Sequence, residues 1–114
     1  MKIAFDYGGV LANSDFLCEV AIVLSNCNHS VSVISALGIH DVEKVKADLA
    51  SKGLGHLSFY PVYLGYAPFP PDAFAGRGKL EVMQKEGISL LIDDNPTICK
   101  VVREGGLKAI LVNV

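Results

Sequence analysis

Short apolar segments alternate with longer, more polar segments along this 114-residue chain. The apolar segments have the length of strands and most are rich in β-branched residues, which predicts strands at residues 3–5, 31–35, 56–63, 88–92 and 107–112. Capping residues and helical apolar spacing predict helices between them, at residues 15–25, 41–52, 79–86 and 96–104. Strands that alternate with helices form a parallel sheet, because the right-handed crossovers place helices on both faces. The order therefore predicts a three-layer, Rossmann-like α/β fold with five parallel strands.

Composition excludes several other classes of protein. The chain is 51% apolar and 19% charged, which predicts a single folded domain over residues 1–114 rather than a disordered segment. The net charge is −2 and the basic residues are scattered, so no nucleic-acid or membrane footprint is expected. No apolar run reaches the roughly 18 residues that span a bilayer. Three widely spaced cysteines favour a reduced, cytoplasmic protein over a disulfide framework.

The first predicted strand ends in an aspartate, Asp6, that two glycines follow at once. Ligands of open α/β sheets bind beyond the carboxyl ends of the strands, so a carboxylate placed there is a candidate nucleophile or metal ligand. Gly8 and Gly9 indicate a tight turn beside it. The alternative interpretation is that Asp6 only caps this turn.

Further polar residues stand at or near other strand ends, namely Ser35, Lys79 and the pair Asp93-Asp94. The ends of parallel strands share one edge of a sheet, where neighbouring carboxylates repel each other unless a cation neutralises them. Ligand sets made only of oxygen suit Mg²⁺, which also binds water and substrate phosphates. A lysine and a hydroxyl nearby would hold further phosphate oxygens. This combination predicts phosphoryl transfer at a Mg²⁺ site.

The same residues resemble the motifs of the haloacid dehalogenase (HAD) superfamily. Ile3-Ala-Phe-Asp6-Tyr-Gly-Gly-Val-Leu11 is similar to the first motif, and Leu90-Leu-Ile-Asp-Asp-Asn95 to the fourth. The segment from Val31 to Ser35 and Lys79 occupy the places of the second and third motifs. Residues 106–112 are similar to the final strand of that fold, so the resemblance spans the whole chain.

The resemblance implies a role for each matching residue. Asp6 would be the nucleophile, forming an aspartyl-phosphate, and also a Mg²⁺ ligand together with the Gly8 carbonyl and with Asp94, assisted by Asp93. Ser35 would donate to the phosphoryl oxygens and Lys79 would neutralise charge, with Gly9 and Ala36 as further substrate-binding positions. Each role has a plainer alternative: a strand-end hydroxyl at Ser35, a solvated lysine at Lys79, with Lys85 and Arg77 as rivals, and helix capping by the aspartate pair.

The chain departs from the family pattern in two places. HAD phosphatases usually carry a second aspartate, as general acid and base, where this chain has Gly8. Ile98 stands where the fourth motif usually has another polar residue. The sequence does not place Asp15 or His40, two conceivable substitutes for the missing acid, in the site. General acid–base catalysis contributes about 10²–10⁴ in rate, so substrates with poor leaving groups are expected to suffer most.

No cap domain is expected, because the chain leaves no room for one after Asp6. Residues 61–78 are predicted to form a long loop rich in proline, glycine and aromatic residues, which is either a small lid or a surface for homo-oligomerisation. The leading functional hypothesis is a Mg²⁺-dependent phosphohydrolase acting on a small phosphorylated substrate. A module that binds phosphate or nucleotides without turnover is the second hypothesis, and a metal-free dehalogenase-type hydrolase is the third.

Overall fold

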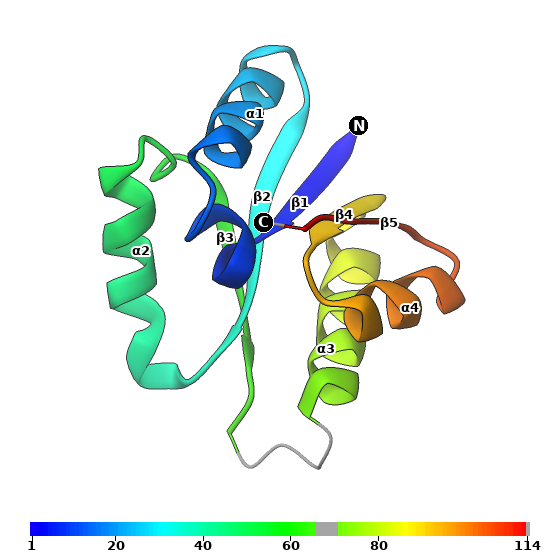
Figure 1. Cartoon of the computed structure of the whole chain (residues 1–114). Coiled ribbons are helices and arrows are strands. Elements are labelled where there is room, and N and C mark those ends of the chain that lie inside the picture. The colour runs from blue at the N-terminus through cyan, green and yellow to red at the C-terminus, as the bar shows by residue number, and fades with distance from the viewer. Residues whose placement is uncertain (66–70, 114) are drawn as a thin grey trace.

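The computed structural model describes residues 1–65 and 71–113, and these form a five-stranded, all-parallel sheet in the order β3-β2-β1-β4-β5. The predicted α/β fold is confirmed (Figure 1). The strands are β1 (Lys2–Asp6), β2 (Ser30–Leu37), β3 (Ser58–Tyr63), β4 (Leu90–Asp93) and β5 (Lys108–Leu111). Pro61 lies in β3, which is an edge strand of the sheet, as its missing N–H group predicts.

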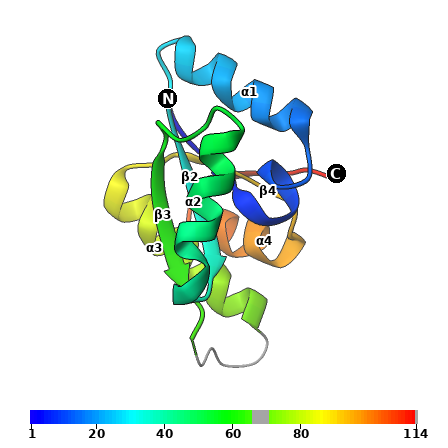
Figure 2. The same cartoon turned by 90° about the vertical axis from the view of Figure 1, so that its left-hand side faces the viewer.

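Two pairs of helices cover the two faces of this sheet. The helices are α1 (Asp15–Asn26), α2 (Val42–Ser51), α3 (Pro71–Glu86) and α4 (Pro96–Glu104). In Figure 1, α1 and α2 lie on one face, and α3 and α4 on the other; Figure 2 views the molecule from the α2 side. Among the described residues no cap domain is inserted between β1 and α1, and no helix is long and apolar enough to cross a membrane.

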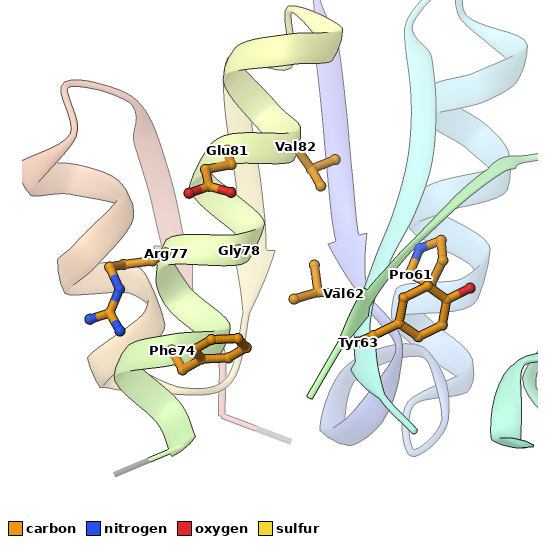
Figure 3. Close-up of a pocket in the computed structure, with 8 residues that line it drawn as sticks. All are labelled: Pro61, Val62, Tyr63, Phe74, Arg77, Gly78, Glu81 and Val82. Carbon is orange, nitrogen blue, oxygen red and sulfur yellow. The ribbon is translucent and has the colours of Figure 1, made fainter. Parts of the chain in front are cut away.

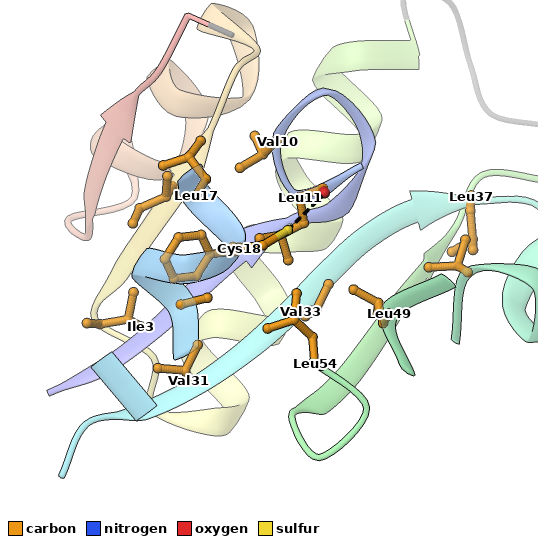
Figure 4. Close-up of a cluster of buried hydrophobic side chains, with 14 residues drawn as sticks. Ile3, Val10, Leu11, Leu17, Cys18, Val31, Val33, Leu37, Leu49 and Leu54 are labelled. Carbon is orange, nitrogen blue, oxygen red and sulfur yellow. Dashed lines mark hydrogen bonds between the residues drawn. The ribbon is translucent and has the colours of Figure 1, made fainter. Parts of the chain in front are cut away.

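Alternating side chains of the central strands build a separate hydrophobic core on each face. Phe5 and Val33 pack under α1 and α2 in the cluster drawn in Figure 4, whereas Ala4 and Ile34 pack under α3 and α4. This period of two follows from the strand geometry. It also decides which face each polar residue at the carboxyl edge can reach.

The prediction of a loop over residues 61–78 is wrong in its second half. Helix α3 begins at Pro71, so residues 71–78 are helical and Lys79 lies in the middle of a helix rather than at its start. Proline is well tolerated in the first helical turn, and the two glycines that suggested a loop have packing roles. A Cβ on Gly76 would lie only 3.0 Å from the Cβ of Val101 in α4, and one on Gly78 would overlap Val62 of β3 (Figure 3).

This correction removes part of the proposed lid or oligomer surface. Phe74, one of its aromatic residues, belongs to α3, and Tyr63 ends β3. Tyr66 and Phe69 lie outside the described residues, so their predicted role stays untested. Phe74 and Tyr63 instead line a cavity of about 310 Å³ between β3 and α3, together with Arg77 (Figure 3).

Candidate active site

Two neighbouring strands deliver aspartates to the same point of the carboxyl edge. Asp6 is the last residue of β1 and Asp93 is the last residue of β4. The two strands are paired with Phe5 opposite Ile92, so the next residue of each strand is an aspartate. Because side chains alternate along a strand, both carboxylates project toward the face that α3 covers.

Lys79 of α3 joins these two carboxylates. Its Nζ donates to Asp6 Oδ1 at 2.7 Å and to Asp93 Oδ2 at 2.8 Å. The lysine is 1% exposed, Asp6 7% and Asp93 0%, so the three charges are almost completely removed from water. Lys79 is therefore not a solvated lysine. Its predicted rivals lie elsewhere, since Lys85 is exposed and Arg77 lines the cavity of Figure 3.

Asn95, rather than the aspartate pair, caps helix α4. Its side-chain oxygen accepts hydrogen bonds from the backbone N–H groups of Thr97 at 2.9 Å and Ile98 at 3.1 Å. The second oxygen of Asp93 accepts the Asn95 N–H at 3.0 Å, which fixes that carboxylate from both sides. Asp94 is exposed and accepts no hydrogen bond from the part of the chain that the structure describes. Helix capping is therefore the role of Asn95 and not of the aspartate pair. The carboxylate of Asp94 is available to bind a ligand.

The buried charges shift one another's pKa values. Burial raises the pKa of Asp6 to about 7 despite the opposing charge of Lys79, and the negative charge of Asp93 adds to this increase. For Lys79, burial disfavours the ammonium, but the charges of Asp6 and Asp93 outweigh it, so the pKa of this lysine is raised. One buried lysine thus faces two buried carboxylates and a third that is exposed, and negative charge is in excess.

This donor set fits a hard divalent cation. One carboxylate oxygen each from Asp6, Asp93 and Asp94 lie within 4.8 Å of one another. All three are oxygen donors, which suits Mg²⁺, and a dication would offset the excess negative charge. Gly8 and Lys79 line the same cavity of about 270 Å³. The residues predicted to hold a metal are thus brought together.

The turn after Asp6 carries two glycines with opposite requirements. Residues Tyr7–Leu11 form a kinked turn, in which Gly8 and Gly9 depart from helical angles and Gly9 has φ +77°. A Cβ on Gly9 would overlap the carboxylate of Asp94, so only glycine allows this approach. Gly8 has φ −67°, and a Cβ there would meet nothing within 4 Å. The absence of an aspartate at Gly8 is therefore not a steric necessity.

Ser35 lies apart from the charged cluster. It is inside β2 rather than beyond its end, is 3% exposed, and lines a second cavity of about 340 Å³ on the α2 face with Tyr7 and Lys44. Its hydroxyl makes no hydrogen bond to another described residue. Gly8 and Ala36 line both cavities, so the two spaces meet at these residues.

The remaining candidates and the omissions follow from the same geometry. Asp15 and His40 line neither of these two cavities, and Ile98 belongs to the core beneath the cluster. Asp72 and Ala75 also line the charged cavity, from the first turns of α3, and neither is among the site residues predicted from the sequence. The proline and glycines that obscured the start of this helix also obscured them.

No family model matches the chain, and no curated protein does. Solved structures share its fold. A chain from a structure of the Pnkp1/Rnl/Hen1 RNA repair complex matches with a TM-score of 0.77 and 15% identity, over 98% of this chain. A chain from a second structure of the Pnkp1/Rnl/Hen1 complex gives 0.74 and 18%. An uncharacterized protein from Corynebacterium glutamicum gives 0.64 and 15% over 99% of this chain.

This chain covers 42% and 46% of the two complex chains and 85% of the Corynebacterium protein. It therefore spans less than half the length of the first two chains. At these identities the likeness shows the three-layer fold.

Proposed function

We propose that this chain is a HAD-like, Mg²⁺-dependent phosphohydrolase that cleaves small phosphomonoesters through an aspartyl-phosphate on Asp6. The observation that carries the proposal is the buried Asp6–Lys79–Asp93 cluster at the sheet edge, with the free carboxylate of Asp94 beside it. An ion pair that served only folding would not need a third, exposed carboxylate turned toward the same point. The fold shared with chains of an RNA repair complex is compatible with this proposal.

In the proposed first step, a carboxylate oxygen of Asp6 attacks the phosphorus and the bond to the leaving oxygen breaks. Lys79 holds the other oxygen of Asp6, which orients the nucleophile, and its charge offsets the negative charge that accumulates. In the second step, water attacks the phosphorus of the aspartyl-phosphate, and phosphate and the Asp6 carboxylate are regenerated. A Mg²⁺ held by Asp6, Asp94 and the Gly8 carbonyl, with Asp93 in support, would supply charge neutralisation to both steps.

Gly8 sets the expected substrate range. Without an acid at this position the leaving oxygen must take its proton from water, so phenolic leaving groups should react much faster than alkyl ones. The deciding experiment is hydrolysis of p-nitrophenyl phosphate with Mg²⁺, with Asp6→Asn and excess EDTA as controls. We expect turnover that both controls abolish. Equal rates for the wild type and Asp6→Asn would refute the proposal.

A second experiment uses the free space at Gly8. We expect Gly8→Asp to raise the rate on alkyl phosphates by at least tenfold and to change the p-nitrophenyl phosphate rate much less. Gly8→Asn is the matched control, since it fills the same space without a titrating group. Phosphorylated oligonucleotides belong among the substrates tested, because two structures with the shared fold come from an RNA repair complex.

The same glycine supports the second candidate, a module that binds phosphate without turnover. This candidate predicts that inorganic phosphate and Mg²⁺ bind to the wild type and that no phosphomonoester is hydrolysed faster than by Asp6→Asn. Isothermal titration beside the turnover assay separates the two.

A further inference from the structure

The turn that follows Asp6 is attached at one end to helix α2 and at the other to Lys52, the residue that caps α2. At the start of the turn, the Tyr7 hydroxyl donates to Asp48 Oδ2 at 2.6 Å. At its end, Lys52 Nζ donates to the carbonyl oxygens of Leu11 at 3.0 Å and Ala12 at 3.1 Å. Asp48 and Lys52 are one helical turn apart and are themselves paired at 3.5 Å. We call Tyr7, Asp48 and Lys52 the turn clamp.

Bonds within the turn make the two attachments act as one. The Ala12 N–H donates to the Tyr7 carbonyl at 2.9 Å, which closes the turn between its attached ends. The Leu11 carbonyl also accepts the Cys18 thiol at 3.2 Å, drawn as a dashed line in Figure 4. The backbone between the two attachment points is therefore held from α1 and from α2.

The pair within the clamp is too exposed for its main contribution to be global stability. The side chains of Lys52 and Asp48 are 23% and 36% exposed, and ion pairs at such positions contribute little to the free energy of unfolding. What the clamp does fix is the position of residues 8 and 9. Gly8 lines the cavity of the acidic cluster, and Gly9 lies so close to Asp94 that a small shift of the turn would displace this carboxylate.

We propose that Asp48 and Lys52 are positioning residues, which act through Tyr7 and through the Leu11 and Ala12 carbonyls to hold the turn in the shape that binds the metal. The proposal rests on the metal site of the proposed function. It assigns to α2, which contributes no residue to the acidic cluster, the control of two elements of that cluster. These are the Gly8 backbone and the space that Gly9 leaves for Asp94.

The alternative is that the clamp only ties α2 to the sheet. The two roles predict different changes in Mg²⁺ affinity, in the free energy of unfolding and in the mobility of the turn. A tether would change the free energy of unfolding and leave metal affinity alone. A positioning device would weaken metal binding and loosen the turn while the midpoint of unfolding changes little.

The test uses Tyr7→Phe, which removes one hydroxyl, and Asp48→Asn, which keeps the shape and removes the charge. Glu43→Gln, an exposed acid of α2 with no contact to the turn, is the matched control for charge. Mg²⁺ affinity is measured by isothermal titration, and backbone amide exchange of residues 7–12 by nuclear magnetic resonance without metal. We expect both clamp variants to bind Mg²⁺ three- to tenfold more weakly and to exchange the Gly8 and Gly9 amides faster. Glu43→Gln should match the wild type.

A double variant, Tyr7→Phe with Asp48→Asn, sharpens the result. Because both changes act on the same hydrogen bond, Tyr7→Phe by removing its donor and Asp48→Asn by removing the charge of its acceptor, the combined loss of affinity should be close to that of the larger single change. Wild-type affinity and wild-type amide exchange in both single variants would overturn the proposal. A wild type that binds Mg²⁺ without hydrolysing any phosphomonoester would refute the phosphatase alone, and one that binds no Mg²⁺ would refute both.

Discussion

The two sides of the carboxyl edge both carry lysine and aspartate side chains, but these differ in burial and in their bonding partners. On the α3 side, Lys79 and two aspartates are buried and bonded directly to each other. On the α2 side, Lys52 and Asp48 are 23% and 36% exposed, and they bond to backbone carbonyls and to a tyrosine hydroxyl. Buried charges need complete pairing, because an unpaired one costs several kcal/mol, whereas half-exposed groups can exchange a lost partner for water.

This difference teaches where function and stability are coupled. A change on the α3 side should affect both, because the same contacts that orient Asp6 also neutralise the interior. A change on the α2 side should alter metal or substrate binding at little cost in stability.

Lys79→Met should produce the largest effect. It leaves Asp6 and Asp93 buried together without their cation, so we expect a loss of about 3–5 kcal/mol in the free energy of unfolding and loss of turnover. Urea denaturation measures the first and the p-nitrophenyl phosphate assay the second. Asp6→Asn is the control, because it should abolish turnover while Lys79 keeps Asp93 as a partner. If Lys79→Met unfolds at the wild-type urea concentration, the cluster is not the buried charge centre described above.

Gly9→Ala and Gly8→Ala test the turn between the two sides. Alanine at Gly9 meets a positive φ and the Asp94 carboxylate, whereas alanine at Gly8 meets open space in an ordinary conformation. We therefore expect Gly9→Ala to weaken Mg²⁺ binding by ten- to a hundredfold and Gly8→Ala to change it less than threefold. Isothermal titration checks both, and equal affinities would contradict the close approach of Gly9 to Asp94.

Metal binding should depend on pH because the pKa of Asp6 is raised to about 7. Mg²⁺ binds the ionised carboxylate, so its affinity should fall by up to tenfold per pH unit below 7 and level off above it. Without metal, a carboxyl whose folded pKa is raised stabilises the fold at low pH and loses this contribution as pH rises through 7. The stabilisation by Mg²⁺ should therefore be larger at pH 8 than at pH 5.5. Thermal unfolding across this range, with and without metal, measures it.

Ser35→Ala should have the smallest effect. The hydroxyl lines the second cavity, on the α2 face, and bonds to no other described residue, so its removal should leave the free energy of unfolding nearly unchanged. If it donates to the phosphoryl group or to the leaving group, KM or kcat should change by three- to tenfold. Ser32→Ala, a buried serine of the same strand whose hydroxyl bonds the Ile3 carbonyl, is the matched control.

Much of this arrangement could be predicted from local sequence patterns. The strands are short apolar segments with polar residues at their ends. The position of Asp6 and Asp93 could be predicted because each ends an apolar segment and because the ends of parallel strands share one edge of the sheet. Asn95-Pro96 predicted the start of α4 at the correct residue. These features depend only on neighbouring residues, which is why a single sequence contains them.

The features that the sequence hid depend on distant contacts. Gly76 and Gly78 predict a loop when only the neighbouring residues are considered. In the structure they are helical and pack against Val101 and Val62, which are distant in the sequence. Ser35 ends an apolar run, but the alternation along β2 turns it to the opposite face from Lys79. The bond from Tyr7 to Asp48 joins residues 41 positions apart and has no signature in either segment. The predicted cytoplasmic location and the homo-oligomer stay predictions.

The placement of β1 between β2 and β4 has a consequence for the order of folding. Asp6, the proposed nucleophile, is joined through Lys79 to residue 93, so this half of the sheet forms only after residue 93 has been synthesised. Contacts so distant in sequence are slow to form, because the intervening chain must first be ordered. Until then, one edge of β1 lies open and a carboxylate sits beside it. The Asp6–Lys79–Asp93 cluster is therefore completed late, in the step that also pairs this open edge of β1.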